Sequence, residues 1–179
     1  MIITGGKFKG RKIAAPNEKI TRPTLSKVRQ GVFNTLFSIL GEFESKTFFD
    51  VFGGSGIMGI ESLSRGFKEV LVFEKNIKAA QLIKKNYELL NLKPNLKIGD
   101  SVRLIKTVEQ CFDVVYIDPP YDSIVYNEIL KEIVKNISSD SVVVVEHSNE
   151  LDFYPLELIK KKNYGGKLVS FLKLNEESN

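Results

Sequence analysis

The sequence contains a short motif whose groups could hold a planar amine for reaction: Asp118, Pro119, Pro120 and Tyr121. The motif directly follows Phe112–Ile117, an apolar run that is typical of a buried strand. The Asp118 carboxylate and the Pro119 carbonyl are hydrogen-bond acceptors, and the Tyr121 ring is a surface on which a base could stack. Two acceptors on the two hydrogens of an exocyclic amine would direct its lone pair toward a methyl donor. The alternative interpretation is a rigid turn with a capping Asp.

A glycine-rich segment at residues 50–59 is the second candidate site. Its Gly54, Gly56 and Gly59 follow the spacing G-x-G-x-x-G, in which glycines let the backbone turn sharply and approach a ligand. Glu74 lies 20 residues after Gly54, at a position suited to binding the two hydroxyls of a ribose. The spacing therefore predicts a site for an adenosine-bearing cofactor. A purely structural strand-to-helix turn also favours glycine and is the alternative.

A third polar group follows the short strand-like run Asn95–Ile98. Asp100 and Ser101 place a carboxylate and a hydroxyl directly after this run. The carboxylate could accept a hydrogen bond from an adenine amino group. An Asp is equally suited to capping a helix that begins at this point, so the sequence leaves both roles open.

These residues need a scaffold that brings them to one edge, and the alternation of apolar and amphipathic segments predicts one. Apolar runs predict five strands: Thr47–Phe52, Glu69–Glu74, Asn95–Ile98, Phe112–Ile117 and Ser141–Val145. Helical periodicity between the runs predicts four helices: Ile57–Ser64, Ile77–Leu90, Val102–Val108 and Tyr126–Asn136. A helix from Pro23 to about Leu40 precedes them, and an antiparallel hairpin of Leu156–Lys162 and Lys167–Leu174 follows them.

The predicted fold class is α/β. The order of elements favours a doubly wound, Rossmann-like and mostly parallel sheet, covered by helices on both faces, with an antiparallel C-terminal edge. Ligands of such sheets bind beyond the carboxyl ends of the strands, where the strand order reverses. Because the candidate residues all lie at or just after the carboxyl ends of predicted strands, we expect them to form one site.

Composition limits the domain organisation and the location of the protein. The 179 residues are 42% apolar, which suits a single domain of residues 1–179 with a basic arm at 1–23 and a core at 24–179. The single cysteine excludes a disulfide framework. No apolar run approaches the roughly 20 residues of a membrane span, and the N-terminus lacks the apolar core of a signal peptide. We expect a soluble cytoplasmic protein with no membrane association and no obligate protein partner.

The net charge of +4 is concentrated near the N-terminus. Residues 1–30 hold eight basic side chains and one acidic side chain, whereas the other 149 residues hold 18 basic and 21 acidic ones. The basic residues alternate with glycines in a predicted hairpin of Ile2–Thr4 and Lys12–Ala15, which lets the backbone approach a phosphate. This pattern indicates a surface for a polyanion. A solvated hairpin that aids solubility is the alternative.

Other residue types point away from metal-dependent and covalent chemistry. No cluster of His, Cys, Asp and Glu has the spacing of a metal site, so we expect no bound metal. Cys111 is expected to be a small apolar filler, and His147 is expected to be a structural residue.

The two main motifs together carry a resemblance to known enzymes. The tetrad at residues 118–121 and the loop at residues 50–56 (D-x-F-G-G-S-G) resemble those of class I amino-methyltransferases. Nearly the whole chain is similar to the RsmD family of bacterial 16S rRNA guanine-N2 methyltransferases. The family's further motifs are matched by residues 2–12, Arg22-Pro23-Thr24, Val28-Arg29, Val32-Phe33-Asn34 and residues 60–66. The match is looser from about Asn149 onwards.

The resemblance implies S-adenosylmethionine as the cofactor and a guanine of 16S rRNA, within the small ribosomal subunit, as the substrate. It implies that the methionine part is held by Asp50, Phe52, Gly53, Gly54, Ser55 and Gly56. Glu74 would then bind the ribose and Asp100 with Ser101 the adenine, and Arg22 and Thr24 would close over the cofactor. The implied catalytic residues are Asp118, Pro119, Pro120 and Tyr121. The candidate RNA contacts are Lys7, Lys9, Arg11, Lys12 and Arg29.

The sequence leaves three other functions open. DNA adenine and cytosine amino-methyltransferases share the tetrad, although this chain has no insertion large enough to read a duplex sequence. An NAD-binding oxidoreductase would use the glycine spacing but would leave the tetrad without a purpose. A non-enzymatic RNA-binding protein would bind RNA without methyl transfer.

Overall fold

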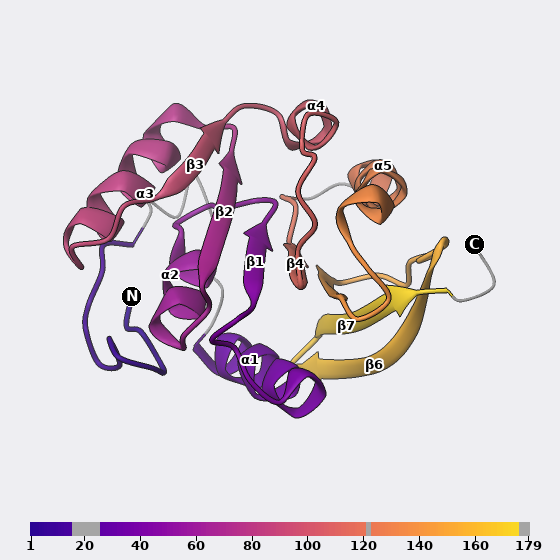
Figure 1. The fold of residues 1–179 in the computed structure, drawn as a ribbon, viewed down its shortest axis with the longest axis horizontal. Coiled ribbons are helices and arrows are strands. Elements are labelled where there is room, and N and C mark those ends of the chain that lie inside the picture. Colours follow the sequence, from indigo (N-terminus) through magenta and orange to yellow (C-terminus); the bar gives the residue numbers. More distant parts are fainter. Residues whose placement is uncertain (16–25, 121–122, 176–179) are drawn as a thin grey trace.

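The computed structural model describes residues 1–15, 26–120 and 123–175. Their main feature is a seven-stranded sheet with the order β3-β2-β1-β4-β5-β7-β6 (Figure 1). The strands are β1 (Thr47–Asp50), β2 (Glu69–Glu74), β3 (Asn95–Ile98), β4 (Val114–Ile117), β5 (Val142–His147), β6 (Leu156–Tyr164) and β7 (Lys167–Leu174). The first five are parallel, and β7 runs antiparallel to both β5 and β6. The predicted fold class is therefore confirmed.

Helices cover both faces of this sheet. They are α1 (Ser26–Leu40), α2 (Ile57–Ser64), α3 (Ile77–Glu88), α4 (Ser101–Ile105) and α5 (Ser123–Ile133), and a short 3₁₀ helix, Val134–Asn136, follows α5. Side chains of α1, α2 and α3 pack on one face with strand residues such as Phe48, whereas those of α4 and α5 pack on the other face with residues such as Phe49. Successive strand residues point to opposite faces, so continuously apolar strands feed both cores.

Several element boundaries differ from those predicted. The elements α2, β2, β3 and β7 have the predicted bounds. Strand β1 ends at Asp50, because the Gly53 amide bonds to the Phe73 carbonyl (2.7 Å) and turns the chain toward β2. Helix α4 begins at Ser101 because Asp100 caps it. The predicted start of α1, at Pro23, lies outside the described residues.

The basic arm is a hairpin that packs against the core. An antiparallel bridge joins Ile2 to Lys12, and the Ile13 amide donates to the Met1 carbonyl (2.9 Å). The side chains of Ile3 and Ile13 are buried in the core cluster that also contains α1, α2 and α3. The arm therefore has its own apolar anchors, and its hairpin form agrees with the prediction.

The helices of this structure give no sign of a bilayer span. Among residues 1–15, 26–120 and 123–175, no helix combines the length and the apolar character that crossing a membrane requires.

Candidate active site

The strand order reverses beside β1, which lies between β2 and β4. Because these strands are parallel, their carboxyl ends meet at one edge of the sheet, where ligands of such folds bind. Asp50 ends β1, Glu74 ends β2 and Asp118 directly follows β4. The sheet thus brings together three of the carboxylates that the sequence singled out.

Asp50 is a buried carboxylate that pairs with no cation among residues 1–15, 26–120 and 123–175. Its residue is 1% exposed, and no described residue donates a hydrogen bond to either oxygen. Burial, together with the charges of Asp118 and Glu74, raises the pKa of this carboxyl to about 8. The nearby amides of Phe52 and Gly59 oppose this shift without reaching hydrogen-bond geometry. A buried, unpaired acid of this kind suits a cationic ligand group.

The glycine loop after β1 is held in a conformation that needs its glycines. A Cβ at Gly53 would lie 2.4 Å from Val72 Cγ1, so only glycine fits against β2. Gly56 has a φ of 76°, in the left-handed region, at the start of α2. Gly53 and Gly56 are therefore needed for the strand-to-helix turn itself, as the structural alternative predicted. This requirement is compatible with a ligand role for the loop.

Glu74 fastens this loop to β2. Its Oε2 accepts a hydrogen bond from the Gly54 amide (2.7 Å), and its Oε1 accepts one from the Asn76 amide (2.6 Å). Burial raises the pKa of Glu74, and these amides oppose the shift. Its contact with a ribose stays a prediction.

Asp100 and Ser101 both have structural roles. Asp100 caps α4 by accepting a hydrogen bond from the Arg103 amide (3.3 Å), which confirms the capping role that the sequence left open. A hydrogen bond from Lys75, 3.1 Å from Asp100, lowers the pKa of the Asp100 carboxyl. Ser101 is buried and donates to the Val51 carbonyl (2.7 Å). Their contact with an adenine stays a prediction.

Asp118 is paired with a lysine from the far end of the chain. Lys167 Nζ lies 2.8 Å from Asp118 Oδ1 and 3.2 Å from Glu146 Oε2. Burial raises the pKa of Asp118, and the charge of Lys167 opposes this shift. Pro119 is buried and Pro120 is exposed. Tyr121 lies outside the described residues, as do Arg22 and Thr24, so their predicted roles are untested.

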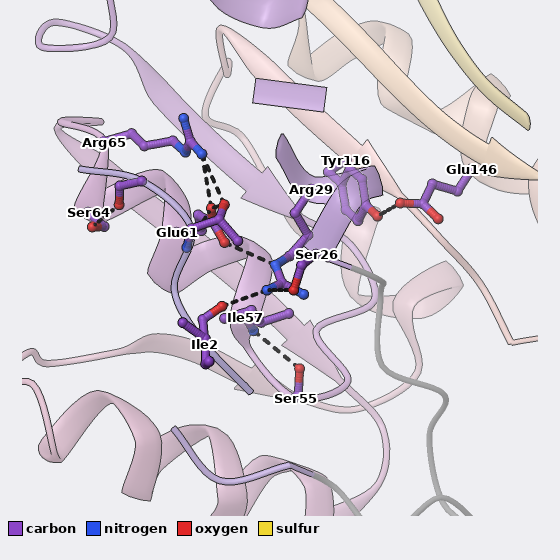
Figure 2. Close-up of polar contacts among 12 residues, drawn as sticks. Ile2, Ser26, Arg29, Ser55, Ile57, Glu61, Ser64, Arg65, Tyr116 and Glu146 are labelled. Atoms are coloured by element: carbon purple, nitrogen blue, oxygen red, sulfur yellow. Dashed lines mark hydrogen bonds and ion pairs between the residues drawn. The ribbon is translucent and has the colours of Figure 1, made fainter. Parts of the chain in front are cut away.

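The structure corrects the placement of Arg29 among the RNA contacts. Its residue is 1% exposed, and its Nε donates to Oε2 of the fully buried Glu61 (3.0 Å), as Figure 2 shows. Its Nη2 donates to the Ile2 carbonyl (2.7 Å) and to Ser26 Oγ (3.2 Å). Arg29 therefore joins α1, α2 and the arm from inside the core. The other candidates, Lys7, Lys9, Arg11 and Lys12, are exposed on the arm.

Sequence reasoning missed Asn86, which links the arm to the glycine loop. Asn86 is fully buried, and its side chain donates to the carbonyls of Ala14 (3.1 Å) and Ser55 (3.2 Å). It also accepts a hydrogen bond from the Ala14 amide (2.9 Å). Its place between Ile83 and Tyr87, on the buried side of α3, is a sequence signal, because a polar residue there needs a partner.

Two minor predictions have different outcomes. His147 is 2% exposed, with one ring nitrogen 2.8 Å from Ser170 Oγ and the other 2.7 Å from the Asn149 carbonyl, which confirms a structural role. Cys111 was expected to fill an apolar space, but it is exposed. It lies in the segment before β4, as the sequence predicted, but its exposure shows that the expectation of an apolar filler was wrong.

The strand order, the glycine loop after β1 and the acids at the ends of β1, β2 and β4 define a class I methyltransferase fold. The solved rRNA methyltransferase aviRa from Streptomyces viridochromogenes has the same fold. It superposes with a TM-score of 0.71 at 14% identity, and the match covers 86% of each chain.

The family follows from the sequence match. Residues 1–173 match the family described as "Conserved hypothetical protein 95", so the chain belongs to this family, the RsmD family of rRNA methyltransferases. YlbH of Bacillus subtilis is 31% identical over 176 residues, which are 92% of this chain and 94% of the relative. "Ribosomal RNA small subunit methyltransferase D" of Buchnera aphidicola (subspecies Acyrthosiphon pisum) is 35% identical over 156 residues, 83% of this chain and 78% of the relative. The predicted resemblance is confirmed.

Proposed function

We propose that this protein transfers a methyl group from S-adenosylmethionine to the exocyclic N2 amine of a guanine in 16S rRNA, in the cytoplasm. One observation carries the proposal: the buried Asp50, which has no cation partner among the described residues, ends β1, and the Asp118-Pro119 pair directly follows the adjacent parallel strand β4, at the edge where this fold binds ligands. A site for a cationic cofactor and a site for an amine are thus neighbours.

The residues present fit the cofactor. The Asp50 carboxylate, which accepts no hydrogen bond from the described residues, can bind the ammonium of the methionine part. Gly53 lies close against β2. Because residues 53–56 are Gly, Gly, Ser and Gly, Ser55 alone among them has a side chain that could fill the loop. Glu74 would bind the ribose, and Asp100 with Ser101 the adenine. When bound, S-adenosylmethionine supplies a methyl group already activated by a positively charged sulfur.

The Asp118-Pro119 pair would orient the amine. The exocyclic nitrogen is a poor nucleophile, because its lone pair is delocalised into the base. Asp118 Oδ1 bonds to Lys167, which leaves Oδ2 as an acceptor for one amine hydrogen, and the Pro119 carbonyl is the second acceptor. Asp118 would also take the proton that the nitrogen must lose once its new bond to carbon has formed. Tyr121 would stack on the base, and Pro120 would stiffen the turn.

The arm supports an RNA substrate. Exposed Lys7, Lys9, Arg11 and Lys12 project from a hairpin fixed to the core. Such a cluster on an otherwise slightly acidic chain favours binding to phosphates. The Buchnera relative is named a small-subunit rRNA methyltransferase, which supports 16S rRNA, within the small ribosomal subunit, as the partner.

The test is methyl transfer from labelled S-adenosylmethionine to small ribosomal subunits that lack this modification, followed by nucleoside analysis. We expect 2-methylguanosine in the 16S rRNA. Naked 16S rRNA, added DNA and NAD are tested in parallel. Methyladenine or methylcytosine in the DNA would identify a DNA amino-methyltransferase instead, and binding of NAD without S-adenosylmethionine would identify an oxidoreductase. RNA binding with no transfer to any substrate would leave a non-enzymatic binding protein.

Reversing two charges of the arm should weaken RNA binding. Lys9→Glu with Lys12→Glu is the cleaner pair, since the Arg11 side chain donates to the Leu89 carbonyl (2.9 Å) and so also has a structural role. We expect the slope of log affinity against log salt to fall in magnitude by about 1 to 2, as two phosphate contacts are lost. Filter binding at several salt concentrations measures this.

The matched control reverses Lys106 and Lys131, two exposed lysines beside α4 and in α5, on the other face of the sheet. It makes the same charge change at a distance from the arm. An equal loss of affinity and slope in both double variants would mean that net charge acts, and not the arm.

A further inference from the structure

Three strands contribute to a polar network at the carboxyl edge of β4. Lys167 begins β7 and bridges two acids, with Nζ 2.8 Å from Asp118 Oδ1 and 3.2 Å from Glu146 Oε2. Glu146 belongs to β5, is 1% exposed and accepts a hydrogen bond from the Tyr116 hydroxyl of β4 (Figure 2). Lys167 therefore touches the proposed catalytic acid and is itself held by an acid in the core.

The hairpin topology explains how a residue so late in the chain reaches this edge. β7 runs antiparallel to β5, with His147 opposite Leu168 and Glu146 opposite Val169. The beginning of β7 therefore lies beside the end of β5, and the end of β5 lies beside the end of β4 in the parallel part of the sheet. Lys167 follows the turn at Gly165 and Gly166, so the turn sets its position.

The titratable groups around Asp118 come from five elements. They are Lys167 on β7, Glu146 on β5, Tyr116 on β4, Tyr126 on α5 and Asp50 on β1. The local net charge depends on Asp118 and on three of these groups. Asp118, Glu146 and Asp50 are acids, and Lys167 is the cation that contacts Asp118 and Glu146. Without it, the half-buried carboxylate of Asp118 would lie beside the buried carboxylate of Glu146 with no cation between them, and ionising both would be disfavoured.

We propose that Lys167 is a positioning residue for methyl transfer: its ammonium keeps Asp118 ionised and in one orientation, and Glu146 holds that ammonium in place. The proposal rests on the proposed function, since it gives Asp118 the task of accepting a hydrogen bond from the amine. A carboxylate can do this with Oδ2 while Oδ1 stays bonded to Lys167. A protonated Asp118 would be a poorer acceptor and could not take the departing proton.

The electrostatics support this reading. Burial raises the pKa of Asp118, and the charge and hydrogen bond of Lys167 pull it back down. Burial and the Asp118 charge raise the pKa of Glu146 to about 7. Burial alone would lower the pKa of Lys167, but the charges of Asp118 and Glu146 outweigh it and raise the pKa, so the lysine stays charged at neutral pH. Removing the ammonium should therefore raise the pKa of Asp118 further.

The test compares Lys167→Met, Lys167→Arg and the control Lys162→Met, which removes an exposed lysine of the same hairpin. Single-turnover rates of methyl transfer are measured from pH 5.5 to 9.5 at saturating cofactor and RNA. For Lys167→Met we expect the acidic limb to move up by about one pH unit, so the rate falls about tenfold at pH values on that limb and approaches the wild-type rate at high pH. Lys167→Arg should keep the limb of the wild type, as should Lys162→Met.

A merely structural role predicts something else. An equal loss of rate at every pH, or an acidic limb that does not move, would overturn the proposal. Carbon-13 titration of the Asp118 carboxyl by NMR, in the wild type and in Lys167→Met without RNA, measures the same shift independently of activity. If the wild type transfers no methyl group, the proposed function fails, but the titration still decides whether Lys167 sets the charge of Asp118. An unchanged Asp118 titration would reject the inference alone.

Discussion

Replacing Asp118 with asparagine should lower the rate of methyl transfer by about two to three orders of magnitude while the cofactor affinity changes by less than about threefold. The amide is nearly isosteric, but it replaces an acceptor with a donor that faces the amine hydrogens, and it cannot take a proton. Loss of a positioned polar group in an active site typically has an effect of this size. Single-turnover kinetics measure the rate, and calorimetric titration with S-adenosylmethionine measures the affinity.

The fold should tolerate this change, so a loss of rate can be interpreted. In Asp118→Asn, Lys167 keeps its ion pair with Glu146 (3.2 Å), so its half-buried ammonium still has an acid partner. The matched control is Asp140→Asn, an exposed acid before β5. A rate within about threefold of the wild type in Asp118→Asn would remove Asp118 from the mechanism.

Asp50 should make cofactor binding depend on pH. Its carboxyl has a pKa of about 8, and only the charged form attracts an ammonium. Below that pKa, binding must first remove a proton, so we expect affinity for S-adenosylmethionine to rise up to about tenfold per pH unit between pH 6 and 7.5. Asp50→Asn should bind about 10- to 100-fold more weakly at pH 7.5, with little pH dependence. Calorimetric titration at four pH values checks both expectations.

The same shift has a consequence for stability with the opposite sign. An acid whose pKa is raised by folding binds more protons in the folded state, so its burial costs stability as pH rises from about 4 to about 8. Without cofactor, Asp50→Asn should therefore melt at a higher temperature than the wild type at pH 8, and Asp140→Asn should not.

For the cofactor-binding prediction, a wild-type affinity for S-adenosylmethionine that is flat from pH 6 to 7.5 would contradict the assignment of Asp50.

The layout of the site could be predicted because it depends on local patterns. Short apolar runs gave the strands, and the rule that ligands bind at the carboxyl ends of parallel strands placed Asp50, Glu74 and Asp118 together. The helix-capping role of Asp100 could also be proposed from the sequence, because a cap depends only on the next three residues. Boundaries were less accurate where tertiary hydrogen bonds end an element, as at the end of β1.

The partners of the polar residues could not be predicted in the same way. Arg29 lies in a cation-rich segment, and its pairing with Glu61 depends on how α1 crosses α2, 32 residues later. Lys167 reaches Asp118 across 49 residues and only because β7 is antiparallel. Charge patterning counts such residues correctly but cannot tell a solvated cation from a buried one.

The attachment of the arm affects what a ligand encounters there. The Phe8 amide donates to Ser64 Oγ (2.9 Å), that hydroxyl donates to the Gly5 carbonyl (2.6 Å), and the Thr4 amide donates to Glu61 (3.2 Å). Ordering a backbone costs about 1–2 kcal/mol per residue in conformational entropy. For this hairpin the entropy is lost when the protein folds, and not when a ligand binds. A polyanion that binds the lysines of this hairpin therefore meets a preformed surface, and the association is docking rather than folding coupled to binding.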